Sequence, residues 1–206
     1  MTPIVGLLLG TAQAGGVGAA IQLGTSRFAG PSELAGFLDP GVSTELALTL
    51  PVGGVEVGVN GALAHHNGCY YDSQAYGGCP NAPGQPGPLI QGDVRLWSVG
   101  PTVVAPEVAR IGPAILSTSG TVQVVGMPLL MDEDYYEEEV VEESWGGQDP
   151  GWHDDLYYGA KAQVDLGLPV ALESTAPIVF LGTSVAWTTR LGLSYAPVLG
   201  IRQPIR

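Results

Sequence analysis

The strongest constraint on the fold of this chain is an alternation of side chains with a period of two residues. It is most regular in the stretch DLYYGAKAQVDLG, residues 155–167. Leucine, tyrosine, alanine and valine occupy every second position, and the positions between carry a tyrosine, glycines and polar or charged side chains. A period of two is typical of a β-strand whose faces meet different surroundings. The alternation leaves open whether the apolar face packs into a soluble core or faces lipid.

Seven further segments carry strand patterns and are separated by Gly, Pro and Asn. Besides 155–167, we expect strands at about residues 17–28, 42–50, 55–64, 93–104, 109–125, 178–189 and 190–201. The fifth strand in chain order is the least regular, because Pro113 and Gly120 interrupt it. The chain is therefore predicted to be all-β with about eight strands. A count of ten stays open, because residues 168–177 have room for an extra half-strand.

The connections between these strands alternate in length. We expect short ones near Pro51, Pro106 and Leu168, and long ones at residues 29–41, 65–92 and 127–154. Antiparallel strands joined in this order place the long loops on one side of the sheet and the short turns on the other. The pattern predicts an up-and-down antiparallel arrangement.

The composition of the less apolar face indicates which face is wet. Charged residues make up only 13% of the chain, where about 25% is usual. This face carries mainly Gly, Ala, Ser and Gln, whereas water-exposed β surfaces are rich in Lys, Glu, Thr and Arg. Small residues fit the inside of a narrow closed barrel. We therefore expect the Val, Leu and Ile face to meet lipid, with Tyr158, Trp187 and Tyr195 toward the strand ends.

Six charged residues are assigned to the interior of this barrel, three of them acidic and three basic. They are Glu45, Glu56, Arg95, Lys161, Asp165 and Arg190. Buried charges persist when they are paired, which fits the balance of signs. The set either lines a narrow path for ions or forms a salt-bridged plug. An interior enclosed by eight strands is just wide enough for side chains to fill, so we expect a plug with little or no pore activity.

The formal net charge of −13 comes mostly from one segment. Eleven of the twenty acidic residues lie between Met131 and Asp155, and the rest of the chain carries nine acids and seven bases. No basic patch is available to neutralise phosphates, which argues against a nucleic-acid partner. Candidate ligands for Ca²⁺ or Mg²⁺ in this segment are Asp132, Glu133, Asp134, Glu137, Glu138 and Glu139. Their spacing matches no ordered calcium loop, so a solvated charge run is the favoured interpretation.

The start of the chain is typical of a secretory signal. An apolar run from Ile4 to Leu9 precedes the small-residue pattern Ala12-Gln13-Ala14, which predicts a signal over residues 1–14. The alternative is a mobile apolar tail. In an exported protein we expect Cys69 and Cys79 to form a disulfide within the second long connection.

Metal binding and catalysis find little support in the sequence. His65, His66 and His153 are expected on the long-loop side, but nothing fixes their geometry, so no metal site is predicted. Ser144 and Asp154 accompany His153, yet no sequence context marks a serine as a nucleophile. We predict no catalytic residues, no cofactor and no enzyme activity.

The segments GVGAAIQLGTSRF, GGVEVGVNGALAHH and DLYYGAKAQVDLG, with the long polar loops and the export-like start, resemble the small outer-membrane β-barrel proteins of Gram-negative bacteria. The resemblance covers most of residues 15–206 and rests on pattern, with no short diagnostic motif. It implies a single up-and-down transmembrane barrel in the outer membrane, with long loops outside the cell and short turns in the periplasm. Such barrels usually finish on an aromatic residue, whereas this chain ends VLGIRQPIR.

The predicted protein is an outer-membrane barrel with a structural, surface-display or small-solute pore role. Its expected partners are outer-membrane lipid, including lipopolysaccharide, and divalent cations at an external acidic loop, residues 127–154. The alternative is a secreted soluble β-sandwich or lectin-like module, in which the Val and Leu faces pack together and the acidic loop binds a cation or ligand.

Overall fold

The computed structural model describes residues 16–29, 40–71, 88–126, 156–171, 176–189 and 191–203. These residues form eight β-strands. In chain order the strands are β1 (Gly18–Ala29), β2 (Gly41–Val52), β3 (Val55–Tyr71), β4 (Pro88–Ile111), β5 (Ala114–Gly126), β6 (Leu156–Pro169), β7 (Ile178–Thr188) and β8 (Gly192–Gln203). Within these ranges no helix is long and apolar enough to cross a membrane.

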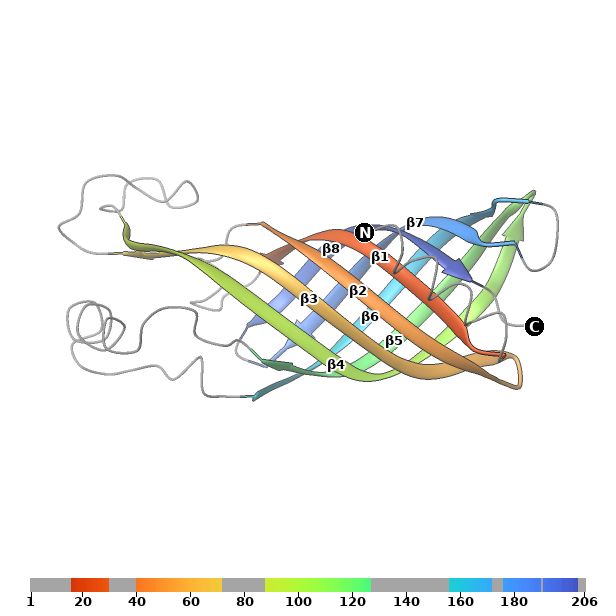
Figure 1. The fold of residues 1–206 in the computed structure, drawn as a ribbon, viewed down its shortest axis with the longest axis horizontal. Helices are drawn as coiled ribbons and strands as arrows, with labels where there is room; N and C mark the ends of the chain where they lie inside the picture. Colours follow the sequence, from red (N-terminus) through yellow and green to blue (C-terminus); the bar gives the residue numbers. More distant parts are fainter. Residues whose placement is uncertain are drawn as a thin grey trace.

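The strands form one closed antiparallel barrel. Each strand pairs with the next in sequence, and β8 pairs with β1 to complete the ring. Figure 1 shows the strands wrapping around a common axis at a steep tilt. The prediction of an up-and-down barrel of eight strands is therefore confirmed. The two-sheet sandwich is wrong for the part of the chain described, because its strands belong to a single sheet whose faces are the inside and the outside of the barrel.

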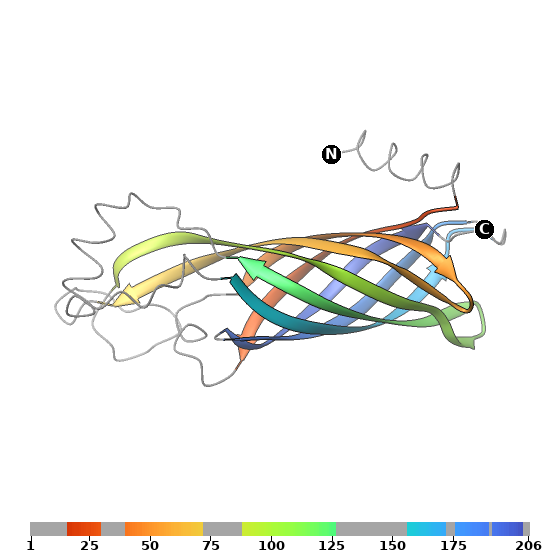
Figure 2. The same cartoon turned by 90° about the horizontal axis from the view of Figure 1, so that it is seen from below.

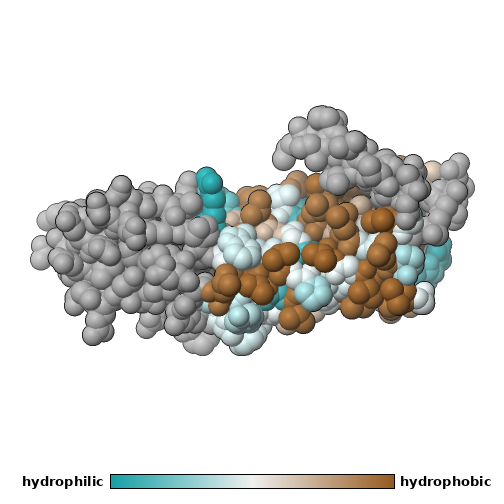
Figure 3. Space-filling model, turned by 60° about the horizontal axis from the view of Figure 1, so that its bottom comes forward, coloured by the Kyte–Doolittle hydropathy of each residue, from teal (hydrophilic) through white to brown (hydrophobic). Residues whose placement is uncertain are grey.

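The alternation in β6 has the expected consequence for burial. Along this strand exposed and buried residues alternate from Leu156 to Leu168. Tyr158 is 62% exposed on the outside, whereas its neighbour Tyr157 is 2% exposed on the inside. The same division holds in β2, where Leu48 and Leu50 face outward while Thr49 faces the interior. Large apolar side chains thus cover the outside of the barrel (Figure 3), where they form a hydrophobic surface over the strands.

The connections divide between the two ends of the barrel, which we call the loop end and the turn end. Residues 30–39, 72–87 and 127–155 join strands at the loop end and lie outside the described residues. A short connection between β7 and β8 is at the same end. At the turn end, tight turns join β2 to β3 and β4 to β5, and residues 170–177 join β6 to β7. Figure 2 gives a second view of this division.

The turn expected near Pro106 is wrong. The segment APEVA lies inside β4, where the pairing with β5 shifts register between Ala105 and Ala109. A proline without an N–H is tolerated at such an irregularity. The chain turns instead at Gly112, whose φ of 60° is readily available to glycine. The strand after this turn begins at Ala114, so Pro113 precedes the strand and does not interrupt it.

The β3–β4 hairpin continues past its neighbours at the loop end. The pairing of β3 with β2 ends at His65, and that of β4 with β5 ends at Trp97. The two strands remain paired with each other beyond these points, as far as Tyr71 and Pro88. A two-stranded ribbon therefore extends beyond the closed barrel, as Figure 1 shows for the yellow and green strands.

Several sequence-based predictions fall outside the described residues. These are the signal over residues 1–14, the acidic segment 127–154, His153, Arg190 and the disulfide, for which Cys79 and the side chain of Cys69 are not described. They stay predictions.

Two glycines on the inner face bring neighbouring strands into close contact. A Cβ atom at Gly58 would overlap the carbonyl oxygen of Leu48, and one at Gly100 would overlap the carbonyl oxygen of Val122. At Gly120, in contrast, a Cβ atom would meet nothing within 4 Å.

We therefore expect G100A to destabilise the barrel, because the backbone must shift to admit the methyl group. The free energy of unfolding should fall by roughly 1–3 kcal/mol, the usual cost of overpacking. The measurement is the urea midpoint of unfolding in detergent micelles. The matched control G120A should leave that midpoint nearly unchanged, and equal effects of the two substitutions would contradict the close approach at Gly100.

Candidate functional site

The interior of the barrel is the candidate site, and it contains two separate cavities. The turn-end cavity has a volume of about 30 Å³ and the loop-end cavity about 100 Å³. Since a water molecule needs roughly 10–15 Å³ of such space, the turn-end cavity holds about two or three waters and the loop-end cavity about seven to ten. Glu45 is the residue that lines both cavities. The side chains around Glu45 therefore form the partition between them.

An ion pair across the barrel builds this partition. Lys161, on β6, places its Nζ against Oε1 of Glu45, on β2. Asn60, on β3, donates from its amide nitrogen to the same carboxylate oxygen. Lys161 and Glu45 are 8% and 14% exposed, so the two charges meet largely away from water. The period of two places all three side chains on the inner face, as the sequence predicts for the two charged residues.

A second ion pair lies deeper toward the turn end. Arg202 Nη2 lies 3.3 Å from Asp165 Oδ2, and Arg202 Nη1 donates to Ser117 Oγ at 3.0 Å. Asp165 is fully buried. The guanidinium also lies over the ring of Phe180, 5.5 Å from its centroid. This arrangement neutralises a carboxylate that has no access to solvent.

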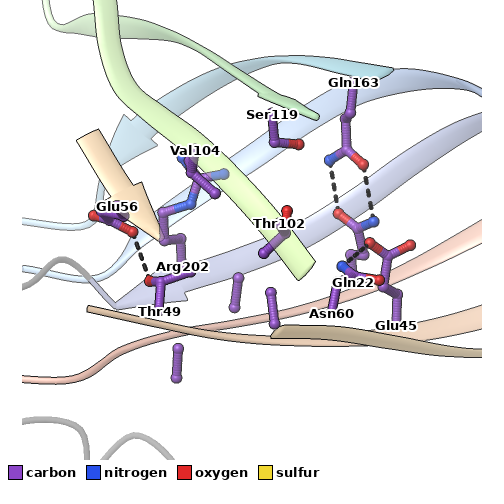
Figure 4. Close-up of a pocket in the computed structure, with 13 residues that line it drawn as sticks. Gln22, Glu45, Thr49, Glu56, Asn60, Thr102, Val104, Ser119, Gln163 and Arg202 are labelled. Atoms are coloured by element: carbon purple, nitrogen blue, oxygen red, sulfur yellow. Dashed lines mark hydrogen bonds between the residues drawn. The ribbon is translucent and has the colours of Figure 1, made fainter. Parts of the chain in front are cut away.

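Two glutamines extend this polar network across the barrel. Gln22 and Gln163 exchange hydrogen bonds of 3.0 and 2.8 Å through their amide groups, as drawn in Figure 4. Gln163 also donates to Asp165 Oδ1 at 2.8 Å. Side chains from β1, β6 and β8 thereby bond to one another through the centre of the barrel.

Arg202 is an interior charge that the sequence analysis missed. The eighth strand was expected to end at Ile201, whereas it continues to Gln203. Extending the inward-facing set from Val198 and Gly200 by one more step of two reaches Arg202. A longer strand assignment would have found it.

Arg95 was assigned to the interior, and this prediction is wrong. Its side chain is exposed on the outside, and the next residue, Leu96, is 6% exposed on the inside. Leu96 packs with Val125, Tyr157 and Leu191. Because successive residues of a strand face opposite sides, this apolar cluster at the loop end directs Arg95 outward. The error came from assuming that the inner face is polar along its whole length.

Glu56 lies inside the barrel as predicted, but without a counter-ion. It is 7% exposed and accepts a hydrogen bond of 2.7 Å from Thr49 Oγ1. Among the described interior residues, three acids accompany two bases, and both bases are paired with other carboxylates: Lys161 with Glu45 and Arg202 with Asp165. The predicted balance of three acids and three bases does not hold for this part of the chain.

Packed side chains narrow the loop end of the interior. The cluster around Leu96 and Tyr157 is joined by Phe28 and Ala64. Phe28 also lies against the ring of His66, with 5.2 Å between centroids, and His66 Nε2 lies 3.0 Å from Ser26 Oγ. An opening wide enough for a solute would have to displace these groups.

The histidine pair on β3 does not assemble a site. His66 is 1% exposed inside the barrel, whereas His65 is exposed on the outer face, beside Arg95 in the pairing of β3 with β4. Both residues lie at the loop end, as expected, but on opposite faces of β3. No group of three His, Cys, Asp or Glu side chains arranged for a metal ion occurs among the residues that the structure describes.

No protein-family model and no curated protein sequence matches this chain. Among solved structures, Neisserial surface protein A has the same fold, with a TM-score of 0.53 and 11% sequence identity over 92% of this chain and 97% of that chain. The outer-membrane protein Ail of Yersinia pestis is also similar, with a TM-score of 0.44 and 12% identity over 90% and 97% of the two chains. The likeness to Neisserial surface protein A confirms the predicted resemblance for the fold.

We expect K161M to be strongly destabilising, because it leaves the Glu45 carboxylate inside the barrel without its cation. Removing one partner of a buried pair typically costs about 3–5 kcal/mol. The double variant E45Q/K161M should recover most of that loss, since no charge is then left unpaired. Urea unfolding of the three proteins in the same micelles measures both differences.

The matched control is R110M, which breaks the exposed pair between Arg110 and Glu107 at 2.7 Å. Exposed pairs contribute little, so its midpoint should stay within error of the unchanged protein. Equal stabilities of K161M and E45Q/K161M would show that the interior pair is not the reason for the loss.

Proposed function

We propose that this chain is a non-enzymatic outer-membrane protein whose closed barrel crosses the bilayer and anchors the loop-end connections outside the cell. The observation that supports this proposal is the distribution of side chains between the two faces. Leu63, Val122 and Leu181 are each more than 60% exposed on the outside, while Asp165, Gln163 and Arg202 are buried inside. A soluble barrel would present the opposite pattern, because its apolar side chains would fill its core.

The length of the strands fits this role. A tilted β-strand needs about 9–11 residues to cross the hydrocarbon of a bilayer. The shortest strand, β7, has 11 residues and β6 has 14. Each strand is paired with a neighbouring strand on both sides around the closed ring. A closed ring is the arrangement that a β-sheet requires in lipid.

Exposed aromatic side chains support an orientation in the membrane. Tyr158, Trp187 and Tyr195 point outward and are 62%, 54% and 41% exposed, and all three lie in the half of their strands nearer the loop end. Tyr and Trp gather where hydrocarbon meets head groups. We therefore place the outer interface of the membrane at these residues, with the long connections outside the cell.

The state of the interior favours a structural or display role over a pore. The two cavities are small and are separated by the Glu45–Lys161 pair. The cluster around Leu96 and Tyr157 further narrows the loop end. Outer-membrane lipid, including lipopolysaccharide, is the partner that the outer face fits. Binding of divalent cations by the acidic segment, residues 127–154, remains part of this proposal.

The insertion can be tested at Ala162, which faces outward on β6 between Gly120 and Val185. A162R should lower the free energy of unfolding from lipid by about 2–4 kcal/mol, the cost of arginine near the bilayer midplane. The measurement is the urea midpoint of unfolding from phospholipid vesicles. In lipid-free zwitterionic micelles that adapt to the side chain, the penalty should be smaller.

A labelling experiment gives an independent check in a background where Cys69 and Cys79 are changed to Ser. In membranes opened to both sides, a lipid-insoluble maleimide should react with A162C slowly and with E107C rapidly, because Glu107 is exposed at the turn end. Equally rapid labelling at both positions would contradict the membrane assignment. Such a result would leave the barrel fold itself untouched.

The closed interior predicts that the protein conducts poorly. Reconstituted into planar bilayers at high salt, it should give no steady single-channel current, while a large trimeric porin in the same membranes gives clear steps. Regular steps from the unchanged protein would overturn the proposed plug and favour a small-solute pore.

A further inference from the structure

The turn-end cavity combines an unbalanced charge with a set of oxygen atoms that have spare lone pairs. Glu56 lines this cavity and is 93% removed from solvent, since its exposed fraction is 7%. Thr49 Oγ1 donates to one carboxylate oxygen, Oε2. The other oxygen has no hydrogen-bond donor among the described residues. A buried carboxylate with one neutral hydrogen bond costs free energy unless a positive charge lies beside it.

Each of the two positively charged side chains described in the interior is paired with a carboxylate other than that of Glu56. Lys161 is held by Glu45 at the partition. Arg202 also lines the turn-end cavity, but its guanidinium contacts Asp165 and Ser117 and lies over Phe180. The described interior therefore carries one negative charge more than it carries positive charges, and Glu56 is the group at which that charge is left.

The walls around Glu56 offer oxygen ligands. Thr49 donates its hydroxyl hydrogen to Glu56, so the lone pairs of its oxygen remain. Thr102 and Ser119 add hydroxyl groups to the same cavity, as Figure 4 shows. Carboxylate and hydroxyl oxygens are among the ligands that hard cations prefer.

The volume of the turn-end cavity and the single negative charge of Glu56 indicate the size and the charge of the cation that would fit. A volume of about 30 Å³ has room for one small ion with little accompanying water, given that a water needs roughly 10–15 Å³. One unmatched carboxylate is neutralised by a single positive charge, and the described residues show no group of three acidic or histidine ligands for a divalent metal. We infer that the turn-end cavity binds one alkali-metal cation, Na⁺ or K⁺, against Glu56. This cation site requires only the closed barrel and is independent of membrane insertion.

The test is cation-specific stabilisation of the full-length protein in zwitterionic micelles. The urea midpoint of unfolding is measured in NaCl, in KCl and in choline chloride at equal concentrations, since choline is too large for the cavity. Binding to the folded state alone predicts a midpoint that rises with Na⁺ or K⁺ and then follows a saturating curve. The midpoint should rise less in choline chloride, which reports only ionic strength.

The variant E56Q should lose the difference between the alkali-metal salts and choline, because it keeps the shape of the side chain and removes the charge. The matched control E107Q removes an exposed carboxylate at the same end of the barrel and should keep the difference. Persistence of the full difference in E56Q would overturn the proposal, and so would equal midpoints of the unchanged protein in all three salts.

A measurement on the unchanged protein covers the case in which E56Q does not fold. Crystals soaked in thallium(I), a heavy mimic of K⁺, should show an anomalous peak within ligand distance of the Glu56 carboxylate. Absence of that peak at full occupancy of other thallium sites would count against the cation. The proposed membrane role would be unaffected, because it is tested by labelling and by insertion energetics.

Discussion

The pairing of β8 with β1 is the contact on which the rest of this structure depends. It closes the sheet, so that the first and last strands have neighbours on both sides. An open sheet of the same sequence would expose two rows of unpaired N–H and C=O groups, which lipid cannot satisfy. Closure also creates an inside and an outside. Because successive residues of a strand point to opposite faces, each strand has one face toward the interior and one toward the outside. Small and polar residues mainly occupy the inner face, and large apolar residues mainly occupy the outer face.

The narrowness of the ring explains the chemistry of the interior. Eight strands enclose a space that side chains nearly fill, so an interior ion pair can join side chains from across the barrel. Glu45 reaches Lys161 from β2 to β6, and Asp165 reaches Arg202 from β6 to β8. These contacts join strands that are not adjacent in the sheet. The interior ion pairs therefore connect strands from different sides of the barrel. The Glu45–Lys161 pair also separates the turn-end cavity from the loop-end cavity.

Much of this arrangement could be predicted from the sequence, because period and composition are local signals. The faces of β6 were assigned correctly at every position from Leu156 to Gly167. The prediction failed where tertiary packing overrides polarity: Leu96 enters the interior with Tyr157 and so sends Arg95 outward. It also failed at Pro106, where a bulge takes the place of a turn, and at Arg202, which lies one step beyond the assigned strand end. Partners across the barrel depend on register, which pattern alone does not give.

Because the strands differ in length, they do not all end at the same level at the loop end of the barrel. Beyond His65, β3 continues for six residues with β4 as its partner. At about 3.3 Å per residue, this ribbon is roughly 20 Å long. Its tip, at Tyr71 and Pro88, lies beyond the ends of the other strands at the loop end. Among the described residues, this ribbon is therefore the part of the barrel that reaches farthest from the turn end, and the closed ring ends well short of its tip.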